Sequence, residues 1–153
     1  MTPLRLSFLT AALLLTLPAA AQVTVTDPWV RGTVAGQMAT GAFMQLKSAK
    51  DARLVEARSP VAGVVEIHEM ALVDNIMRMR AVPALDLPAG RAVELKPGGY
   101  HVMLMDLKQQ VKEGDVVPVS LVIESGGRRE TIEVKASVRA PTARSDPMKK
   151  PGG

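Results

Sequence analysis

The stretch from His68 to Met105 reads HEMALVDNIMRMRAVPALDLPAGRAVELKPGGYHVMLM and contains both histidines of the chain. It also holds five of the nine methionines, and cysteine is absent from the whole sequence. These methionines are Met70, Met77, Met79, Met103 and Met105. Its apolar runs are short and are separated by Asp-Asn, Pro and Gly turn signals, a pattern typical of β-strands. Imidazole and thioether groups gathered without a thiol are ligands that suit copper, Cu(I) in particular.

The same spacing of short apolar runs and turn residues continues on both sides of this stretch. We count about nine such runs and find no helical period longer than a turn or two, which predicts an all-β fold, an antiparallel β-sandwich or barrel. Pro28 is expected to end the first strand, residues 22–27, because proline cannot donate a ladder hydrogen bond. Residues 83–90 are expected to form a connection, and residues 116–124 and 129–138 a final hairpin.

The N-terminus has the features of a secretory signal peptide. Arg5 precedes an apolar run, residues 6–18, and Ala19-Ala20-Ala21 offers a cleavage site. The run is too short for a comfortable membrane span, and no cysteine follows it that could carry a lipid anchor. We therefore expect residues 1–21 to be removed on export. The remainder is expected to divide into one domain, residues 22–139, and a disordered tail, residues 140–153.

Charge and composition exclude some classes of function. The formal net charge is +4 and the charged residues are scattered. No block of Lys and Arg with interleaved aromatic residues is present, so a nucleic-acid partner is not expected. No Ser, His and Asp grouping or carboxylate pair indicates catalysis, so the protein is not expected to be an enzyme. A monomer is the default expectation.

A two-residue turn at Asp74-Asn75 would set the register of the strands around it. The resulting pairs are Val73 with Ile76, Leu72 with Met77, Met70 with Met79, and Glu69 with Arg80. His68 and Met70 are two residues apart and share a face, and Met79 then lies diagonal to His68 on that face. The pairing of Glu69 with Arg80 joins opposite charges and supports this register.

His101 and Met103 are also two residues apart, whereas Val102 and Leu104 face the other way and are expected to enter the core. If the two segments meet, His68, Met79, His101 and Met103 supply two nitrogens and two sulfurs. These neutral ligands would hold Cu(I) firmly but transferably, as suits a carrier. A blue-copper site is excluded because it needs a thiolate.

Each of these residues also has a simpler interpretation. Methionine in a strand usually fills the core, and a lone histidine is more often a surface residue than a ligand. The joint pattern favours a metal site, since both histidines have a methionine two residues on. Zinc is less well suited, because it prefers cysteine, carboxylate or additional histidines.

The spacing of these residues resembles the motif of a known family, the periplasmic copper chaperones called PCu(A)C. In that motif, ten residues separate a His from a Met, twenty-one residues separate this Met from a second His, and one residue separates the second His from a second Met. The chain reproduces this spacing with His68, Met79, His101 and Met103. Residues 27–31 (DPWVR) and 95–100 (LKPGGY) are also similar to the family. The resemblance covers roughly residues 23–138.

The resemblance implies a cupredoxin-like β-sandwich that lacks the cupredoxin cysteine. It implies a periplasmic protein that binds Cu(I) through His68, Met79, His101 and Met103. It further implies delivery of copper to the binuclear CuA centre in subunit II of cytochrome c oxidase, with a Sco-type thiol protein as an additional partner.

Two alternatives stay open at this point. A general periplasmic copper buffer, without a dedicated acceptor, would have the same site. A metal-free β-sandwich interaction module would have no copper affinity, and replacing His101 with alanine would then change only local packing.

Overall fold

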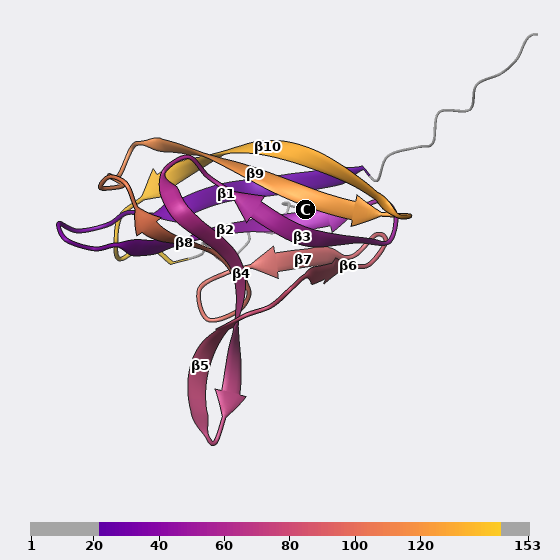
Figure 1. The fold of residues 1–153 in the computed structure, drawn as a ribbon, viewed down its shortest axis with the longest axis horizontal. Helices are drawn as coiled ribbons and strands as arrows, with labels where there is room; N and C mark the ends of the chain where they lie inside the picture. The colour runs from indigo at the N-terminus through magenta and orange to yellow at the C-terminus, as the bar shows by residue number, and fades with distance from the viewer. Residues whose placement is uncertain (1–21, 145–153) are drawn as a thin grey trace, which may run out of the picture.

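The computed structural model describes residues 22–144, which form ten β-strands and no helix (Figure 1). The strands are β1 (Val23–Arg31), β2 (Ala39–Ser48), β3 (Ala52–Arg58), β4 (Ala62–Val73), β5 (Ile76–Ala81), β6 (Leu85–Leu87), β7 (Ala92–Leu95), β8 (His101–Leu107), β9 (Val116–Ser125) and β10 (Arg128–Arg139). The all-β prediction is therefore confirmed.

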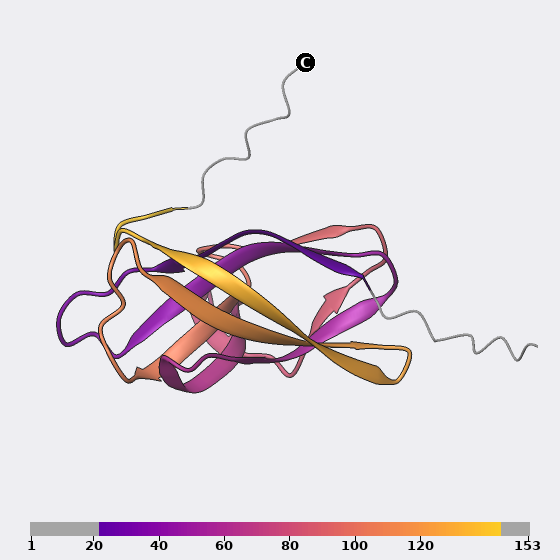
Figure 2. The same cartoon turned by 90° about the horizontal axis from the view of Figure 1, so that it is seen from above.

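The strands form one open sheet in the order β5-β4-β8-β2-β1-β10-β9-β3-β6, and β7 pairs with β2. β3 nevertheless lies against β4, so the sheet curls over its own core. Figure 2 shows β9 and β10 crossing the body side by side. The sequence led us to expect antiparallel neighbours throughout. Among the strand pairs within residues 22–144, β1 and β10 are the exception, because Trp29–Arg31 runs parallel to Ser137–Arg139. An isolated bridge between Leu95 and Tyr100 is also parallel.

The prediction that Pro28 ends the first strand was wrong. β1 continues to Arg31, and its register against β2 shifts between Thr26 and Trp29. Asp27, just before the proline, has a φ of 49°. This irregularity takes Pro28 out of the hydrogen-bond ladder, so its missing N–H does not interrupt the strand.

A short strand inside the expected connection was also missed. β6 pairs with β3 through Leu85 opposite Leu54 and Leu87 opposite Ala52. Leu85 and Leu87 are buried, and the alternation that places them inside is only three residues long. A segment this short has no detectable period, so the pairing depends on the core that the leucines enter.

The core lies between the two halves of the curled sheet. Val102 and Leu104 of β8 are fully buried in it, as the alternation predicted. They pack with large apolar residues from other strands, among them Leu46, Leu54, Leu121 and Ile123. Trp29 is also buried.

The hairpin of β4 and β5 leaves this body (Figure 1). Asp74 and Asn75 have φ values of 51° and 61°, as a two-residue hairpin turn requires, and every pair predicted from that turn is present. β4 pairs with β8 only as far as His68 and with β5 from His68 onward. The outer part of the hairpin therefore has two strands and no third neighbour in the described part of the chain, and all residues of β5 are exposed.

Two expectations fall partly or wholly outside the described residues. The expected signal peptide, residues 1–21, lies outside them, as do residues 145–153 of the expected tail. Between residues 22 and 144, no helix is long and apolar enough to cross a membrane.

Candidate metal centre

The two histidines meet where the β4–β5 hairpin leaves the body. His68 of β4 is the direct cross-strand partner of His101 of β8. Their ring centroids are 5.7 Å apart and the ring planes are inclined by 60°. Both residues are buried, with 9% and 5% of their surface exposed. The structure thus brings together the two segments on which the sequence prediction of a metal site depended.

The turn before β8 orients the ring of His101. Its Nδ1 lies 3.0 Å from the carbonyl oxygen of Gly99. A carbonyl oxygen only accepts hydrogen bonds, so Nδ1 carries the proton of the neutral ring and donates it, which leaves the lone pair of Nε2 available for a metal. Burial lowers the pKa of His101 below its ordinary value, and this favours the neutral form that metal binding requires.

A carboxylate orients the ring of His68. Its Nε2 lies 2.7 Å from Oε2 of Glu66, two residues earlier on the same face of β4. Since a carboxylate accepts, Nε2 donates and the lone pair of the neutral ring lies on Nδ1. Among the described residues, this Nδ1 is buried and has no hydrogen-bond partner. A buried acceptor without a partner is costly, and a bound metal ion would satisfy it.

Three thioethers lie beside the histidines. Met70 pairs with Met79 across the hairpin, and Met103 of β8 pairs with Glu66 of β4. Met70, Met79 and Met103 line a pocket of about 220 Å³ together with His101. The rest of its lining is Arg31, Gln37, Ala39, Thr40, Gly41, Phe43, Pro97 and Gly98. His68 is not part of this lining and is linked to the pocket through the ring of His101.

Of the four predicted ligands, the structure therefore places Met79, Met103 and His101 around one pocket and His68 directly beside it. Met70 also lines the pocket, although the sequence left its role open. Its position two residues after His68 was the signal, because residues at that spacing share a face.

An aromatic pair supports the pocket from β1 and β2. The rings of Trp29 and Phe43 are 4.6 Å apart, and Phe43 lies 6.2 Å from the ring of His101. A Cβ atom at Gly41 would meet the Phe43 ring at 2.7 Å, so this glycine leaves the room that the ring occupies. The guanidinium of Arg31 lies over Phe43, 5.4 Å from its centroid. The sequence did not indicate Phe43 as part of the site.

A larger cavity lies at a different place in the fold. It has about 350 Å³ and is lined by residues near the β9–β10 turn, including Asp51, Arg53, Asp86 and Glu124. It contains neither imidazole nor thioether. Among residues 22–144, no three His, Asp or Glu side chains cluster as a metal site. The histidine pocket and the adjacent His68 together offer two imidazoles and several thioethers, a neutral and soft donor set that favours Cu(I) over hard divalent cations.

Comparisons with known proteins agree with this fold. The family model described as "Putative lipoprotein LpqE-like" matches residues 23–138. The chain belongs to the LpqE-like family. A relative from Leifsonia xyli subsp. xyli, named "Putative lipoprotein Lxx21020", is 34% identical to this LpqE-like protein over 121 residues, which are 72% of each chain.

Solved structures of similar proteins include copper-bound forms. The copper-bound PCuAC domain from PmoF2 is 25% identical to this LpqE-like protein, with a TM-score of 0.63, and the match covers 80% of this chain and 97% of that domain. The solution structure of CuI-DR1885 from Deinococcus radiodurans is 31% identical, with a TM-score of 0.60, and the match covers 78% and 80% of the two chains. The cupredoxin-like β fold predicted from the sequence is confirmed by these neighbours.

Proposed function

We propose that this LpqE-like protein binds Cu(I) through His68, Met79, His101 and Met103 and carries it as cargo to an acceptor protein. The observation that carries the proposal is the direct pairing of two buried histidines, with ring centroids 5.7 Å apart, beside a pocket lined with thioethers. Each imidazole already has one nitrogen engaged in an orienting hydrogen bond, so the other can bind metal. The copper-bound state of the similar PmoF2 domain supports the choice of metal.

The donors suit transfer better than permanent storage. Imidazole and thioether are neutral, so they leave the charge of Cu(I) uncompensated, and the guanidinium of Arg31 adds a positive charge at the pocket. Met79 is 48% exposed and can exchange with a ligand from another protein without unfolding the site. These features favour a carrier over a catalyst.

The proposed acceptor is the CuA centre in subunit II of cytochrome c oxidase, with a Sco-type thiol protein as a further partner. The spacing of the four ligands, which resembles the PCu(A)C motif, supports this choice. Delivery to that centre requires the protein to act in the periplasm. The apolar N-terminal segment and the lipoprotein names of the family and of its relative are consistent with export.

The test is an anaerobic titration of the chain from Gln22 onward with Cu(I), against a competing chromophoric chelator. We expect one tight equivalent, which His101→Ala and Met79→Ala weaken by at least about tenfold because each removes a ligand. Met38→Leu is the matched control, because Met38 is 55% exposed and does not line the pocket. Absence of binding, or equal binding by parent, His101→Ala and Met79→Ala, would contradict the proposal and favour a metal-free interaction module.

A second experiment separates a dedicated carrier from a general copper buffer. The Cu(I)-loaded protein is mixed anaerobically with the copper-free soluble domain of subunit II, with and without a Sco-type protein. Timed samples are then oxidised with ferricyanide, because only the oxidised, mixed-valence CuA centre absorbs visible light, and that absorption is measured. Delivery is supported if the CuA centre forms faster from the Cu(I)-loaded protein than from a Cu(I)–chelator complex of equal affinity. A rate equal to that of the chelator complex indicates a buffer.

A further inference from the structure

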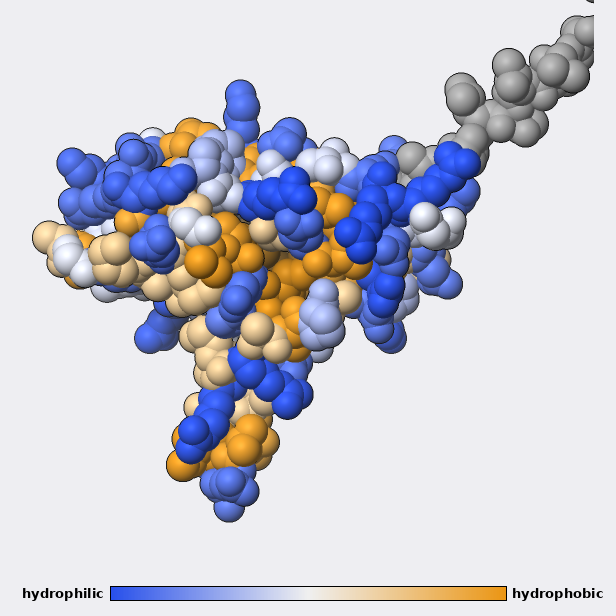
Figure 3. All heavy atoms as spheres, viewed as in Figure 1, coloured by the Kyte–Doolittle hydropathy of each residue, from blue (hydrophilic) through white to orange (hydrophobic). Residues whose placement is uncertain are grey.

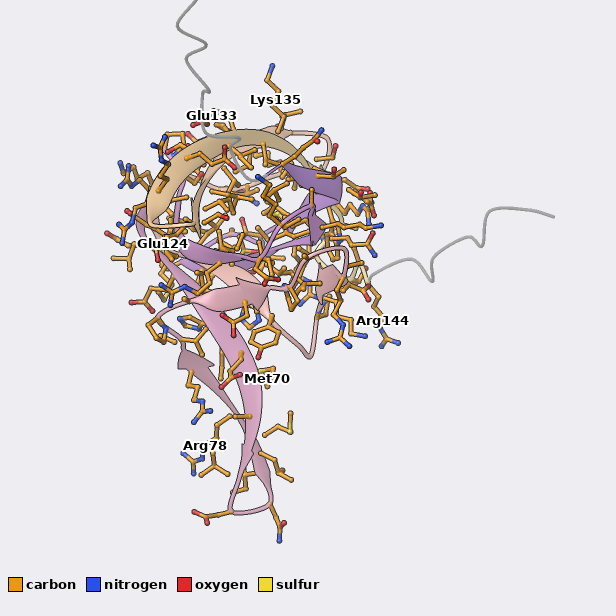
Figure 4. All side chains as sticks on the ribbon, turned by 90° about the vertical axis from the view of Figure 1, so that its right-hand side faces the viewer. Met70, Arg78, Glu124, Glu133, Lys135 and Arg144 are labelled. Atoms are coloured by element: carbon orange, nitrogen blue, oxygen red, sulfur yellow. The ribbon has the colours of Figure 1, made fainter. Side chains whose placement is uncertain are left out.

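The outer part of the β4–β5 hairpin presents three methionines on one face. Met70 and Met79 are direct cross-strand partners. Met77 is two residues from Met79 on β5, so it shares their face and lies diagonal to Met70. Direct partners have Cβ atoms about 4.5–5.5 Å apart and diagonal neighbours about 7–8 Å, within reach of long side chains. Figure 4 shows Met70 on this hairpin, with Arg78 farther toward its tip.

Core packing does not account for these methionines. Met77 is 53% exposed and Met79 is 48% exposed. The nearest cross-strand partner of Met77 is Leu72, which is itself 65% exposed. Figure 3 shows hydrophobic residues at this projecting hairpin, away from the body of the molecule. A thioether that fills no gap is available as a ligand.

The composition of this face selects the kind of cation. By alternation, the part of this face beyond His68 carries Met70, Leu72, Met77 and Met79; the nearest carboxylate on the face of β4, Glu66, lies on the body side of His68 and is hydrogen-bonded to it. The charged residues Glu69, Arg78 and Arg80 lie on the opposite face, where Glu69 and Arg80 form an ion pair of 2.6 Å. Hard cations need oxygen ligands, whereas thioethers alone bind soft monovalent ions such as Cu(I).

We infer that Met70, Met77 and Met79 form a second Cu(I) site, here called the outer site, at which the cargo binds before it reaches the histidines. The four ligands of the proposed function are called the inner site. The inference rests on the proposed function for the identity of the cargo. Met79 belongs to both sites, so one chain holds the ion at one site at a time.

Movement between the sites is a ligand exchange. The Cu–S bonds to Met70 and Met77 break, while bonds to two imidazole nitrogens and to the sulfur of Met103 form, and the bond to Met79 persists. Copper remains Cu(I), so no electron is transferred. In the neutral tautomers that these hydrogen bonds select, Nδ1 of His68 and Nε2 of His101 carry lone pairs, so the exchange itself moves no proton.

The first test uses the double variant His68→Ala/His101→Ala, which removes the inner site and keeps the outer one. We expect this variant to bind one equivalent of Cu(I), at least about tenfold more weakly than the parent. The methyl NMR signals of Met70, Met77 and Met79 should shift together during the titration, and that of Met38 should not. In this background Met77→Leu should weaken binding by a further factor of about ten, whereas Met38→Leu should not.

Two outcomes would overturn the outer site: no Cu(I) binding by the double variant, or binding that Met77→Leu leaves unchanged. Failure of the proposed function is recognised separately. In that case the parent shows no tight binding that depends on His101, whatever the double variant does.

A second test does not require the double variant to fold, although both histidines are buried. Met77→Leu in the otherwise unchanged chain alters an exposed side chain. We expect uptake of Cu(I) from a chelator complex to slow severalfold, with the equilibrium affinity of the inner site unchanged. An unchanged uptake rate would overturn the inference.

Discussion

The β9–β10 and β4–β5 hairpins have the same local design and different surroundings. Each turns through two residues with positive φ, Gly126-Gly127 in one and Asp74-Asn75 in the other. β9 and β10 lie between β1 and β3, and their alternate residues enter the core. β5 is an edge strand with every residue exposed. Turn chemistry therefore sets the register of both hairpins, but neighbouring strands decide whether the side chains stabilise the fold or remain available for binding.

The largest predicted difference concerns one apolar side chain from each hairpin. Leu121 in β9 is fully buried, and Leu121→Ala should lower the free energy of unfolding by about 2–5 kcal/mol. Met77 in β5 is 53% exposed, and Met77→Ala should change it by less than about 0.5 kcal/mol. Urea unfolding followed by circular dichroism measures both. Similar losses of unfolding free energy in the two variants would show that both hairpins contribute equally to stability.

The two turns should also respond differently to substitution. Gly127 has a φ of 75°, where an added Cβ is strained, so Gly127→Ala should cost about 1–2 kcal/mol of stability. Asn75 already tolerates a φ of 61°, and Asn75→Gly should relieve local strain in a hairpin outside the core. We expect Asn75→Gly to slow amide hydrogen exchange in residues 69–80 without changing global unfolding. A global change of the same size in both variants would show that the hairpins unfold together.

The junction between the body and the β4–β5 hairpin should respond to pH. Burial lowers the pKa of His101 below its ordinary value of 6.5, and His68 and Arg31 add repulsion in the same direction. The unfolded chain then binds the proton more readily, so stability is full above about pH 6.5 and falls as the pH decreases, by at most about 1.4 kcal/mol per pH unit. Urea unfolding of the copper-free protein between about pH 7.5 and about pH 5 tests this. His101→Gln should flatten the slope, and an identical slope in the variant would assign it to other groups.

The smallest effect is expected from the ion pair on the back of the β4–β5 hairpin. Arg80 is largely exposed and lies 2.6 Å from Glu69. Glu69→Gln should reduce stability by less than about 1 kcal/mol, and added salt should remove the difference because exposed pairs are screened. Thermal unfolding at low and high salt measures it. A larger loss that persists in salt would mean that Glu69 supports the hairpin through another contact.

The sequence predicted the register of the β4–β5 hairpin better than it predicted the rest of the sheet. The Asp74-Asn75 turn determined the pairing of Met70 with Met79, because a two-residue turn allows one register only. The period of two residues also assigned His101 and Val102 to opposite faces correctly. Both inferences depend on local chemistry, which a single sequence contains.

The features that the sequence missed depend on distant parts of the chain. β6 is a strand because Leu85 and Leu87 enter a core built by other strands. Pro28 lies within a strand because an irregularity at Asp27 accommodates it. The place of Phe43 beside His101 follows from the pairing of β2 with β8, which no local pattern indicated.

The parallel pairing of β1 with β10 has a consequence for biosynthesis. The two strands lie at opposite ends of the described chain, and their ion pair joins Asp27 to Arg139, 112 positions apart. Of the ten strands, the ribosome synthesises β1 first and β10 last. β1 and β9 therefore each lack the neighbour that β10 provides until translation has passed Arg139. Pairings between such distant residues also form slowly. We expect the nascent chain to remain incomplete, and exposed to aggregation or proteolysis, for nearly the whole time of its synthesis.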